Sequence, residues 1–216
     1  VDAVLGTTSY GDILKAIREA MEGKHFQEFK DIDYLPEKLG KRVLTTGGHF
    51  GYLKIAEGCD KHCTYCIIPK LRGKFRSVPM ERLVTQAKEM AEEGVKELIL
   101  VAQETTVYGT DIYGKKSLHI LLKELCKIKG IRWIRVLYCY PEEIYDELIQ
   151  TMKEEKKICH YLDLPIQHAS DRILKRMGRR TTQAELVEIV NKLRREIPDI
   201  VLRTTLISGF PGETQE

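Results

Sequence analysis

The sequence predicts an α/β protein with parallel strands, in the form of a partial (β/α) barrel. Two observations lead to this fold class. From residue 52 onward, short apolar strand-like runs alternate with amphipathic helix-like segments, which implies parallel strands joined by right-handed crossovers. A cysteine-rich loop directly follows the first of these strands, which favours a barrel over an open doubly wound sheet because barrel sites gather at the carboxyl ends of the strands.

The first 48 residues are expected to form a separate piece of the chain. Residues 1–5 predict a strand, and residues 11–21 predict a helix that Ser9 and Asp12 would cap. The apolar stripe of this helix consists of Ile13, Ile17 and Met21. Residues 22–48 predict a linker. One strand and one helix are only half of a larger pattern, so we expect the tail of a preceding α/β domain.

Five strands are expected in the remainder of the chain, at residues 52–56, 97–102, 133–140, 161–164 and 200–207. The run 97–102 is almost wholly apolar, as expected of a strand buried on both faces. Five units are fewer than the eight of a full barrel. We therefore expect the barrel to be partial and the chain to be truncated at both ends.

Four helices are expected between and after these strands, at residues 81–93, 118–125, 144–152 and from 182 onward. Leucines and other apolar residues recur in each segment at the spacing of one helix face. Pro79 precedes the first helix and Gly94 ends it. Thr182 and Glu185 predict a capping box at the start of the last.

Composition indicates a soluble globular protein, with 43% hydrophobic and 31% charged residues among 216. No apolar run approaches the ~20 residues that cross a bilayer, and the chain starts without a signal-peptide pattern. We expect a cytoplasmic protein with no membrane partner, in which six cysteines do not imply disulfides and the clustered ones serve metal binding or catalysis. Cys126 on a predicted helix, Cys139 in a predicted strand and Cys159 just before one are expected to be structural. The net charge of +3 permits a nucleic-acid partner without requiring one, and residues 72–76 are the densest basic stretch near the cysteines.

The most informative motif is C-x3-C-x2-C, formed by Cys59, Cys63 and Cys66. No fourth cysteine follows at metal-site spacing, whereas structural zinc takes four protein ligands and a four-iron cluster is normally held by four thiolates. Three thiolates would leave one iron open for chemistry, which argues for an enzyme. The alternatives are a zinc site completed by His62 or His49, or a set of ordinary buried thiols.

Polar residues follow several of the predicted strands. These segments are residues 103–106, 165–168 and 208–213. Each could be a helix cap or a solvated loop, but on a parallel barrel they converge on the face that also carries the cysteines.

The cysteine loop, with Tyr65 before its last cysteine, resembles the signature of the radical S-adenosylmethionine (SAM) superfamily. The resemblance implies a partial barrel of six units and a [4Fe-4S] cluster held by the three cysteines. It also implies that the open iron binds SAM, and that reductive cleavage of SAM yields a 5′-deoxyadenosyl radical. The cluster and SAM would carry the chemistry, so no catalytic side chain is assigned.

The same resemblance suggests contacts for SAM. Gln103 and Glu104 occupy the place of the family's Gly-Gly-Glu segment, which binds the SAM ammonium group, although its glycines are missing here. Ile207 lies in a partial match to the adenine-binding segment, and Tyr65 would flank the adenine. The strand-end residues Gln167 and His168 are further candidates for cofactor binding.

Several stretches resemble the methylthiotransferase branch of the superfamily. They are residues 54–59, 72–79, 175–180 and 209–214. This kinship implies a second [4Fe-4S] cluster in an N-terminal domain, where the sulfur is methylated before transfer. Residues 1–48 would then be the C-terminal remnant of that domain plus a linker, and residues 49–216 a radical SAM core that is incomplete at its C-terminus.

Residues 101–109 and 163–168 resemble the ribosomal-protein aspartate methylthiotransferases within this branch. The implied substrate is an aspartate β-carbon of small-subunit ribosomal protein twelve, and the implied electron donor is a flavodoxin or ferredoxin. One alternative keeps the reaction and makes tRNA the substrate, as in the tRNA adenosine methylthiotransferases. Another is a non-enzymatic metal-binding module.

Overall fold

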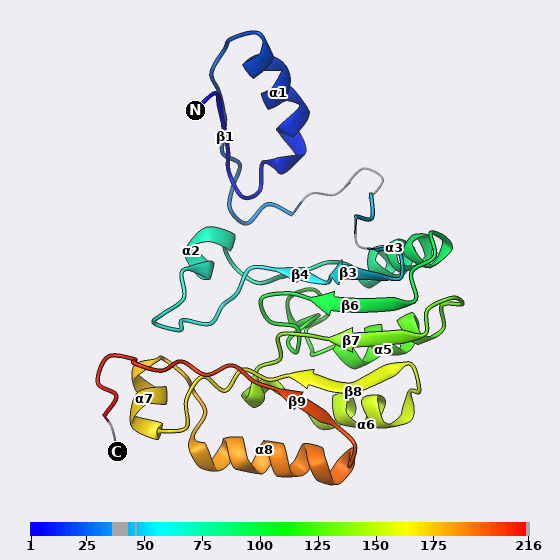
Figure 1. The fold of residues 1–216 in the computed structure, drawn as a ribbon, viewed down its shortest axis with the longest axis vertical. Coiled ribbons are helices and arrows are strands. Elements are labelled where there is room, and N and C mark those ends of the chain that lie inside the picture. The colour runs from blue at the N-terminus through cyan, green and yellow to red at the C-terminus, as the bar shows by residue number, and fades with distance from the viewer. Residues whose placement is uncertain (36–42, 46, 215–216) are drawn as a thin grey trace.

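The computed structural model describes residues 1–35, 43–45 and 47–214, so residues 36–42 and 46 of the predicted linker lie outside the described residues. Its centre is a sheet of five parallel strands (Figure 1). In spatial order these are β3 (Phe50–Lys54), β6 (Glu97–Val101), β7 (Trp133–Val136), β8 (Ile158–Asp163) and β9 (Val201–Arg203).

The spatial order of the strands follows their order in the sequence, and every neighbouring pair is parallel. Each crossover therefore steps in the same direction, as in a barrel, whereas a doubly wound sheet reverses its strand order at a switch point. The predicted α/β class and the partial barrel-type winding are confirmed.

Four helices connect or follow these strands: α3 (Met80–Glu92), α5 (Leu118–Cys126), α6 (Asp146–Glu154) and α8 (Gln183–Glu196). Consecutive helices pack side by side, α3 on α5, α5 on α6 and α6 on α8. The predicted capping box of α8 is present, since the Thr182 hydroxyl accepts from the Glu185 backbone N–H and the Glu185 carboxylate accepts from that of Thr182.

The core lies between the sheet and this row of helices. In β6, Leu98 and Leu100 are fully buried in it, while Glu97, Ile99 and Val101 alternate with them and are only partly buried. The expectation that this strand is buried on both faces is therefore wrong. Five strands do not close a barrel, and the face turned away from the helices stays partly accessible.

Several short elements were not predicted from the hydrophobic pattern. They are α2 (Ile68–Arg72), α4 (Thr110–Tyr113), α7 (Asp171–Arg176), the 3-10 helix η2 (Pro141–Glu143), β4 (Ala56–Glu57) and β5 (Arg76–Ser77). Each is too short to show a hydrophobic period. The β4 and β5 strands pair antiparallel, so the intervening chain, which contains the three cysteines, returns to its starting point.

The N-terminal residues form a separate unit, visible above the main sheet in Figure 1. In it, β1 (Ala3–Leu5) pairs parallel with β2 (Phe26–Glu28), and the 3-10 helix η1 (Tyr10–Asp12) and α1 (Ile13–Met21) lie between them in sequence.

The predicted cap of the N-terminal helix is wrong. The Ser9 hydroxyl accepts a hydrogen bond from the Lys30 backbone N–H at 2.9 Å instead of capping, and α1 begins at Ile13 after the 3-10 turn. The apolar stripe of α1 is exposed, with Met21 at 83% exposure. None of the helices in the described ranges combines the length and hydropathy needed to cross a bilayer.

Candidate functional site

The cysteine loop is held in place by two close backbone approaches. Gly58, directly before Cys59, has a φ of 78°, and a Cβ there would overlap the backbone carbonyl of Lys74. On the other side, a Cβ on Gly178 would lie 2.8 Å from the carbonyl oxygen of His62. Glycine is needed at both positions, because the loop is pressed between the segment before β5 and the turn after α7.

The three cysteines lie in different environments. Cys59 and Cys63 are buried and Cys66 is exposed. The Lys61 backbone N–H donates to the Cys59 sulfur at 3.4 Å, while burial raises the pKa of the Cys59 thiol. The Cys66 N–H donates to the Cys63 carbonyl at 3.0 Å, which forms a tight turn between these two residues.

A cavity of about 470 Å³ lies beside this loop. It is lined by Lys54, Cys59, Cys66, Ile68, Val101, Ala102, Gln103, Tyr138 and Tyr140. The lining residues come from the cysteine loop, from α2 and from the carboxyl ends of β3, β6 and β7. Two of the three cysteines thus border a space of the size that binds a small molecule, at the strand ends where the fold predicts a site.

The end of β7 is a part of the site that the sequence did not predict. Tyr138 and Tyr140 line the cavity, and Tyr138 has a φ of 59°, which is strained for a residue with a side chain. The expected strand 133–140 included both tyrosines, whereas β7 ends at Val136. The signal available in the sequence was Pro141, because proline cannot donate a backbone hydrogen bond within a central strand. The two aromatic residues shortly before it were therefore candidates for the loop that follows the strand.

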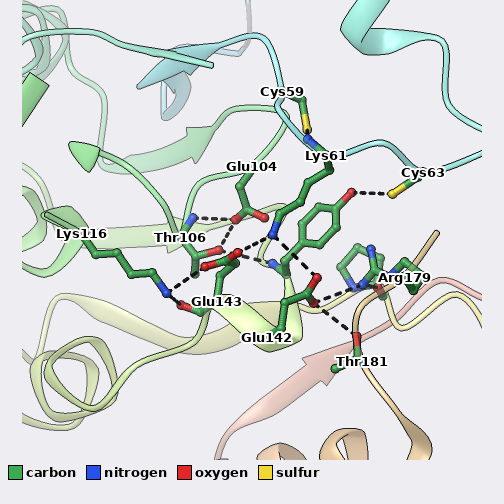
Figure 2. A network of polar contacts seen from close by, with 12 residues as sticks. Cys59, Lys61, Cys63, Glu104, Thr106, Lys116, Glu142, Glu143, Arg179 and Thr181 are labelled. Atoms are coloured by element: carbon green, nitrogen blue, oxygen red, sulfur yellow. Dashed lines mark hydrogen bonds and ion pairs between the residues drawn. The ribbon is translucent and has the colours of Figure 1, made fainter. Parts of the chain in front are cut away.

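Figure 2 shows a polar network that connects the cysteine loop with η2. Lys61 forms ion pairs with Glu143 and, at 3.7 Å, with Glu142, and Lys116 pairs with Glu143 at 2.9 Å. Because of these two lysines, the pKa of Glu143 is lowered in spite of burial. The network ties the loop to the end of the third barrel strand.

Arg179 joins this network from the turn after α7. Its side chain is 1% exposed and lies 3.7 Å from Glu142, and it donates to the carbonyl of Pro165 at 3.2 Å. Its guanidinium is 4.3 Å from the centre of the Tyr140 ring. The Tyr140 hydroxyl is in turn 3.4 Å from the sulfur of Cys63. The buried Arg179 guanidinium therefore stacks on the phenol ring of Tyr140, whose hydroxyl contacts Cys63.

The predicted contact residue Glu104 is 1% exposed and does not line the cavity. Its Oε1 accepts from the backbone N–H and the hydroxyl of Thr106, and its Oε2 has no hydrogen-bond partner among the described residues. Burial raises the pKa of this carboxyl to about 7. Glu104 thus has one buried oxygen without a hydrogen-bond partner among the described residues.

Gln103, the neighbour of Glu104, lines the cavity. Its amide group donates to Glu57 at 3.2 Å, and its Oε1 is buried with no partner in the described part of the chain. Tyr65 is 38% exposed, and burial of its hydroxyl near Cys63 raises its pKa above the ordinary value. Neither Tyr65 nor Cys63 is among the residues that line this cavity.

The remaining predicted residues lie after β8 and β9, away from the lining of the cavity. Gln167 has a φ of 71° and pairs with Leu206 as an isolated β-bridge, and the Ile207 N–H donates to the Gln167 carbonyl at 2.8 Å. His168 accepts from the Ser170 N–H at 2.9 Å and lies 3.4 Å from Glu213. The structure brings Gln167 and Ile207 together, and none of the three predicted residues is among those that line the cavity.

The donor set fits a cluster better than a single ion. Within the described ranges, no group of three His, Cys, Asp or Glu side chains is arranged to hold one metal ion. A four-iron cluster makes a different demand, because each thiolate binds a different iron atom and the sulfurs need not converge on one point. Three cysteines on one short loop, two of which line the cavity, meet this requirement.

The basic stretch near the cysteines is largely engaged within the protein. Arg76 donates to Asp33 at 3.0 Å and to the carbonyl of Arg72 at 3.0 Å, and its side chain is 13% exposed. Arg72 lies 3.8 Å from Glu57. These contacts engage Arg72 and Arg76 within the protein, while Lys74 between them is exposed.

The class of proteins that the fold and the cysteine loop indicate is also the class that a family comparison identifies. A model of the radical SAM superfamily matches residues 53–216. The chain therefore belongs to the radical SAM superfamily, as the cysteine motif predicted.

Curated relatives narrow the comparison. Ribosomal protein uS12 methylthiotransferase RimO of Lachnoclostridium phytofermentans is 68% identical over 216 residues, which are 100% of this chain and 49% of that protein. The RimO of Clostridium botulinum strain Eklund 17B is 56% identical over 218 residues, again with 100% of this chain and 49% of the relative. The chain spans about half the length of the curated relatives it matches.

Solved structures agree on the fold. The radical SAM methyltransferase TsrM from Kitasatospora setae aligns with a TM-score of 0.62 at 19% identity, over 77% of this chain and 32% of TsrM. The cobalamin-dependent SAM radical enzyme OxsB aligns with a TM-score of 0.58 at 15% identity, over 93% of this chain and 26% of OxsB.

Proposed function

We propose that this chain is the central part of a radical SAM methylthiotransferase that modifies ribosomal protein uS12. The observation that carries the proposal is the 68% identity, along the whole chain, to a relative of that name. The target would be an aspartate β-carbon of small-subunit ribosomal protein twelve. A low-potential donor of the flavodoxin or ferredoxin kind would supply electrons.

Cys59, Cys63 and Cys66 would hold a [4Fe-4S] cluster and would leave one of its irons without a side-chain ligand. When bound, the cluster and SAM supply the chemistry, namely reductive cleavage of the sulfonium to a 5′-deoxyadenosyl radical. The chain's own residues would bind and orient the cluster and SAM and would exclude water from the site. Ile68, Val101 and Ala102 give the cavity apolar walls.

The proposed SAM contacts follow the resemblance of the sequence. Gln103 and Glu104 would meet the ammonium group through their unpartnered buried oxygens. Tyr65 and Ile207 would contact the adenine. Gln167 and His168 are proposed as further contacts at the end of β8.

The two segments of the chain would have different roles. We assign residues 1–48 to the end of an N-terminal methylthiotransferase domain plus a linker, and residues 49–216 to the radical SAM core. The separate β1–β2 sheet supports this division. A second [4Fe-4S] cluster would belong to the N-terminal domain.

The proposal is tested with the chain reconstituted anaerobically with iron and sulfide. About four irons and four sulfides per chain are expected, and 5′-deoxyadenosine should form when SAM and dithionite are added. One zinc per chain without labile sulfide would instead indicate a non-enzymatic metal-binding module and end the proposal.

The substrate assignment has to be tested with a longer protein, of the length of the curated relatives. That protein, carrying this chain, is expected to methylthiolate a uS12 peptide and not an anticodon stem-loop. The engaged state of Arg72 and Arg76 supports the protein substrate. Activity on the stem-loop alone would transfer the assignment to tRNA adenosine modification.

A further inference from the structure

We propose that Tyr140 is a positioning residue for Cys63, and that its hydroxyl donates a hydrogen bond to the cysteine sulfur which raises the reduction potential of the cluster. This inference rests on the proposed function, which assigns a cluster to the cysteine loop. It adds a residue from the third barrel strand end, where the sequence predicted no site residue.

The contact itself is direct. The Tyr140 oxygen and the Cys63 sulfur are 3.4 Å apart, although the two residues are 77 positions apart in the sequence. In the free protein either atom can be the donor. Once Cys63 binds iron it carries no proton, so the phenol hydroxyl is the only donor in the pair.

The phenol is held in place from several sides. The Arg179 guanidinium lies 4.3 Å from the ring centre and the Lys61 ammonium 5.1 Å from it, both within the distance of a cation–π interaction. The Tyr140 backbone N–H donates to the Thr106 hydroxyl at 3.4 Å.

The arginine is itself anchored. It donates to the Pro165 carbonyl and pairs with Glu142, and Glu142 accepts from the Thr181 hydroxyl at 3.4 Å. Figure 2 shows Arg179, Glu142 and Thr181 close together, with dashed lines from Glu142 to each of the other two. These contacts hold the ring and backbone of Tyr140 and so keep its hydroxyl beside Cys63.

The effect on the cluster follows from charge. Reduction would transfer one electron from the donor to the cluster, so the thiolates and sulfides would become more negative. No bond or proton at Tyr140 would change. A hydrogen bond to a sulfur stabilises the more negative state more strongly, which raises the potential. The nearby cation Arg179 acts in the same direction.

The test compares Tyr140→Phe with the parent chain, both reconstituted to four irons, in redox titrations followed by electron paramagnetic resonance. At a fixed potential, the ratio of reduced to oxidised cluster is expected to fall about tenfold in the variant, which for one electron is about 59 mV. Tyr108→Phe is the matched control, because it removes a phenol hydrogen bond of 2.8 Å to the Val78 carbonyl. We expect its potential to be unchanged, whatever its stability.

The outcomes separate the two proposals. If the parent chain forms no four-iron cluster, the proposed function fails. If parent and Tyr140→Phe both carry the cluster at the same potential, the proposed function stands and this inference is overturned.

A second variant covers the case in which Tyr140→Phe does not retain four irons. Arg179→Lys keeps the charge but loses the planar group that stacks on the ring. A smaller shift in the same direction is expected, because the phenol is then held less firmly. An unchanged potential in that variant overturns the inference.

Discussion

At the scale of single residues, the six cysteines fall into two groups that their surroundings distinguish. Cys59, Cys63 and Cys66 share one loop, and two of them border the cavity. Cys126 packs against the core from α5, Cys139 is fully buried near the hydroxyl of Thr105, and Cys159 is partly buried in β8. The second group behaves as small apolar side chains, as its positions on predicted helices and strands indicated.

Cys63→Ala is expected to abolish assembly of the four-iron cluster and cleavage of SAM, because the loop offers only three thiolates. Iron and sulfide content after reconstitution and the yield of 5′-deoxyadenosine measure both losses. Cys126→Ala is the control and should retain both. A SAM-cleaving cluster that persists in Cys63→Ala would refute the ligand assignment.

Glu104 predicts a pH dependence of stability. Burial raises its pKa to about 7 in the folded protein, from an ordinary value near 4.5. Between these pH values the folded state binds more protons than the unfolded state, so the contribution to stability is full below about pH 4.5 and is lost as pH rises to about 7. The loss is up to about 3 kcal/mol.

This slope is isolated by Glu104→Gln, which cannot ionise. The free energy of unfolding of the cluster-free parent, minus that of the variant, should fall as pH rises from about 4.5 to 7, as measured by denaturant titration at each pH. A difference that stays constant over this range would show that Glu104 ionises normally.

At the scale of elements, the site depends on how strands and loops end. The β4–β5 pair brings the two ends of the cysteine loop together, and the turn after α7 presses on the loop from the other side. The β7 strand ends at Val136, which frees the next residues to line the cavity.

Gly58→Ala tests the close approach at the start of the loop. It combines strain at a positive φ with overlap of the Lys74 carbonyl, so we expect a loss of about 3 kcal/mol or more in the free energy of unfolding and reduced iron binding. Gly114→Ala is the matched control, with a φ of 69° and open space around the new Cβ. Its loss should be about 1 kcal/mol. Equal losses in the two variants would show that the close approach at Gly58 contributes nothing.

At the scale of the whole molecule, polar contacts among the described residues join two units. The core is built from residues after position 50, and the N-terminal unit has its own two-stranded sheet. Asp33 connects them, because its carboxylate accepts from the Lys74 backbone N–H at 2.8 Å and from Arg76 at 3.0 Å. The Thr7 hydroxyl adds a bond to the Leu71 carbonyl at 2.8 Å.

Asp33→Ala is therefore expected to loosen the N-terminal unit without unfolding the core. Protease cleavage within residues 1–48 should become several-fold faster, while the denaturation midpoint of the core changes by less than the equivalent of about 1 kcal/mol. Asp31→Ala is the control, since Asp31 Oδ1 accepts the local Asp33 N–H at 2.8 Å. Equal cleavage rates in both variants would show that Asp33 does not hold the N-terminal unit to the core.

Much of this architecture could be read from the sequence because the signals were local. The capping box at Thr182, the stop at Gly94 and the apolar helix faces depend on neighbours within a few residues, and the structure contains all of them. The same holds for the cysteine motif, whose three ligand candidates lie on one loop. Local patterns were misleading at Ser9, where a partner 21 positions away took the hydroxyl from its expected cap.

The order of strands and helices, and the position of the cysteine loop at a strand end, were encoded in spacing and hydrophobic period alone. Tertiary structure decided which residues stand behind the cysteines: Tyr140 approaches Cys63 from 77 positions away, and Arg179 reaches Tyr140 from a different turn. It also decided that Glu104 is buried. Burial and side-chain contacts between distant segments arise only when the strands are packed side by side, and no local pattern records them.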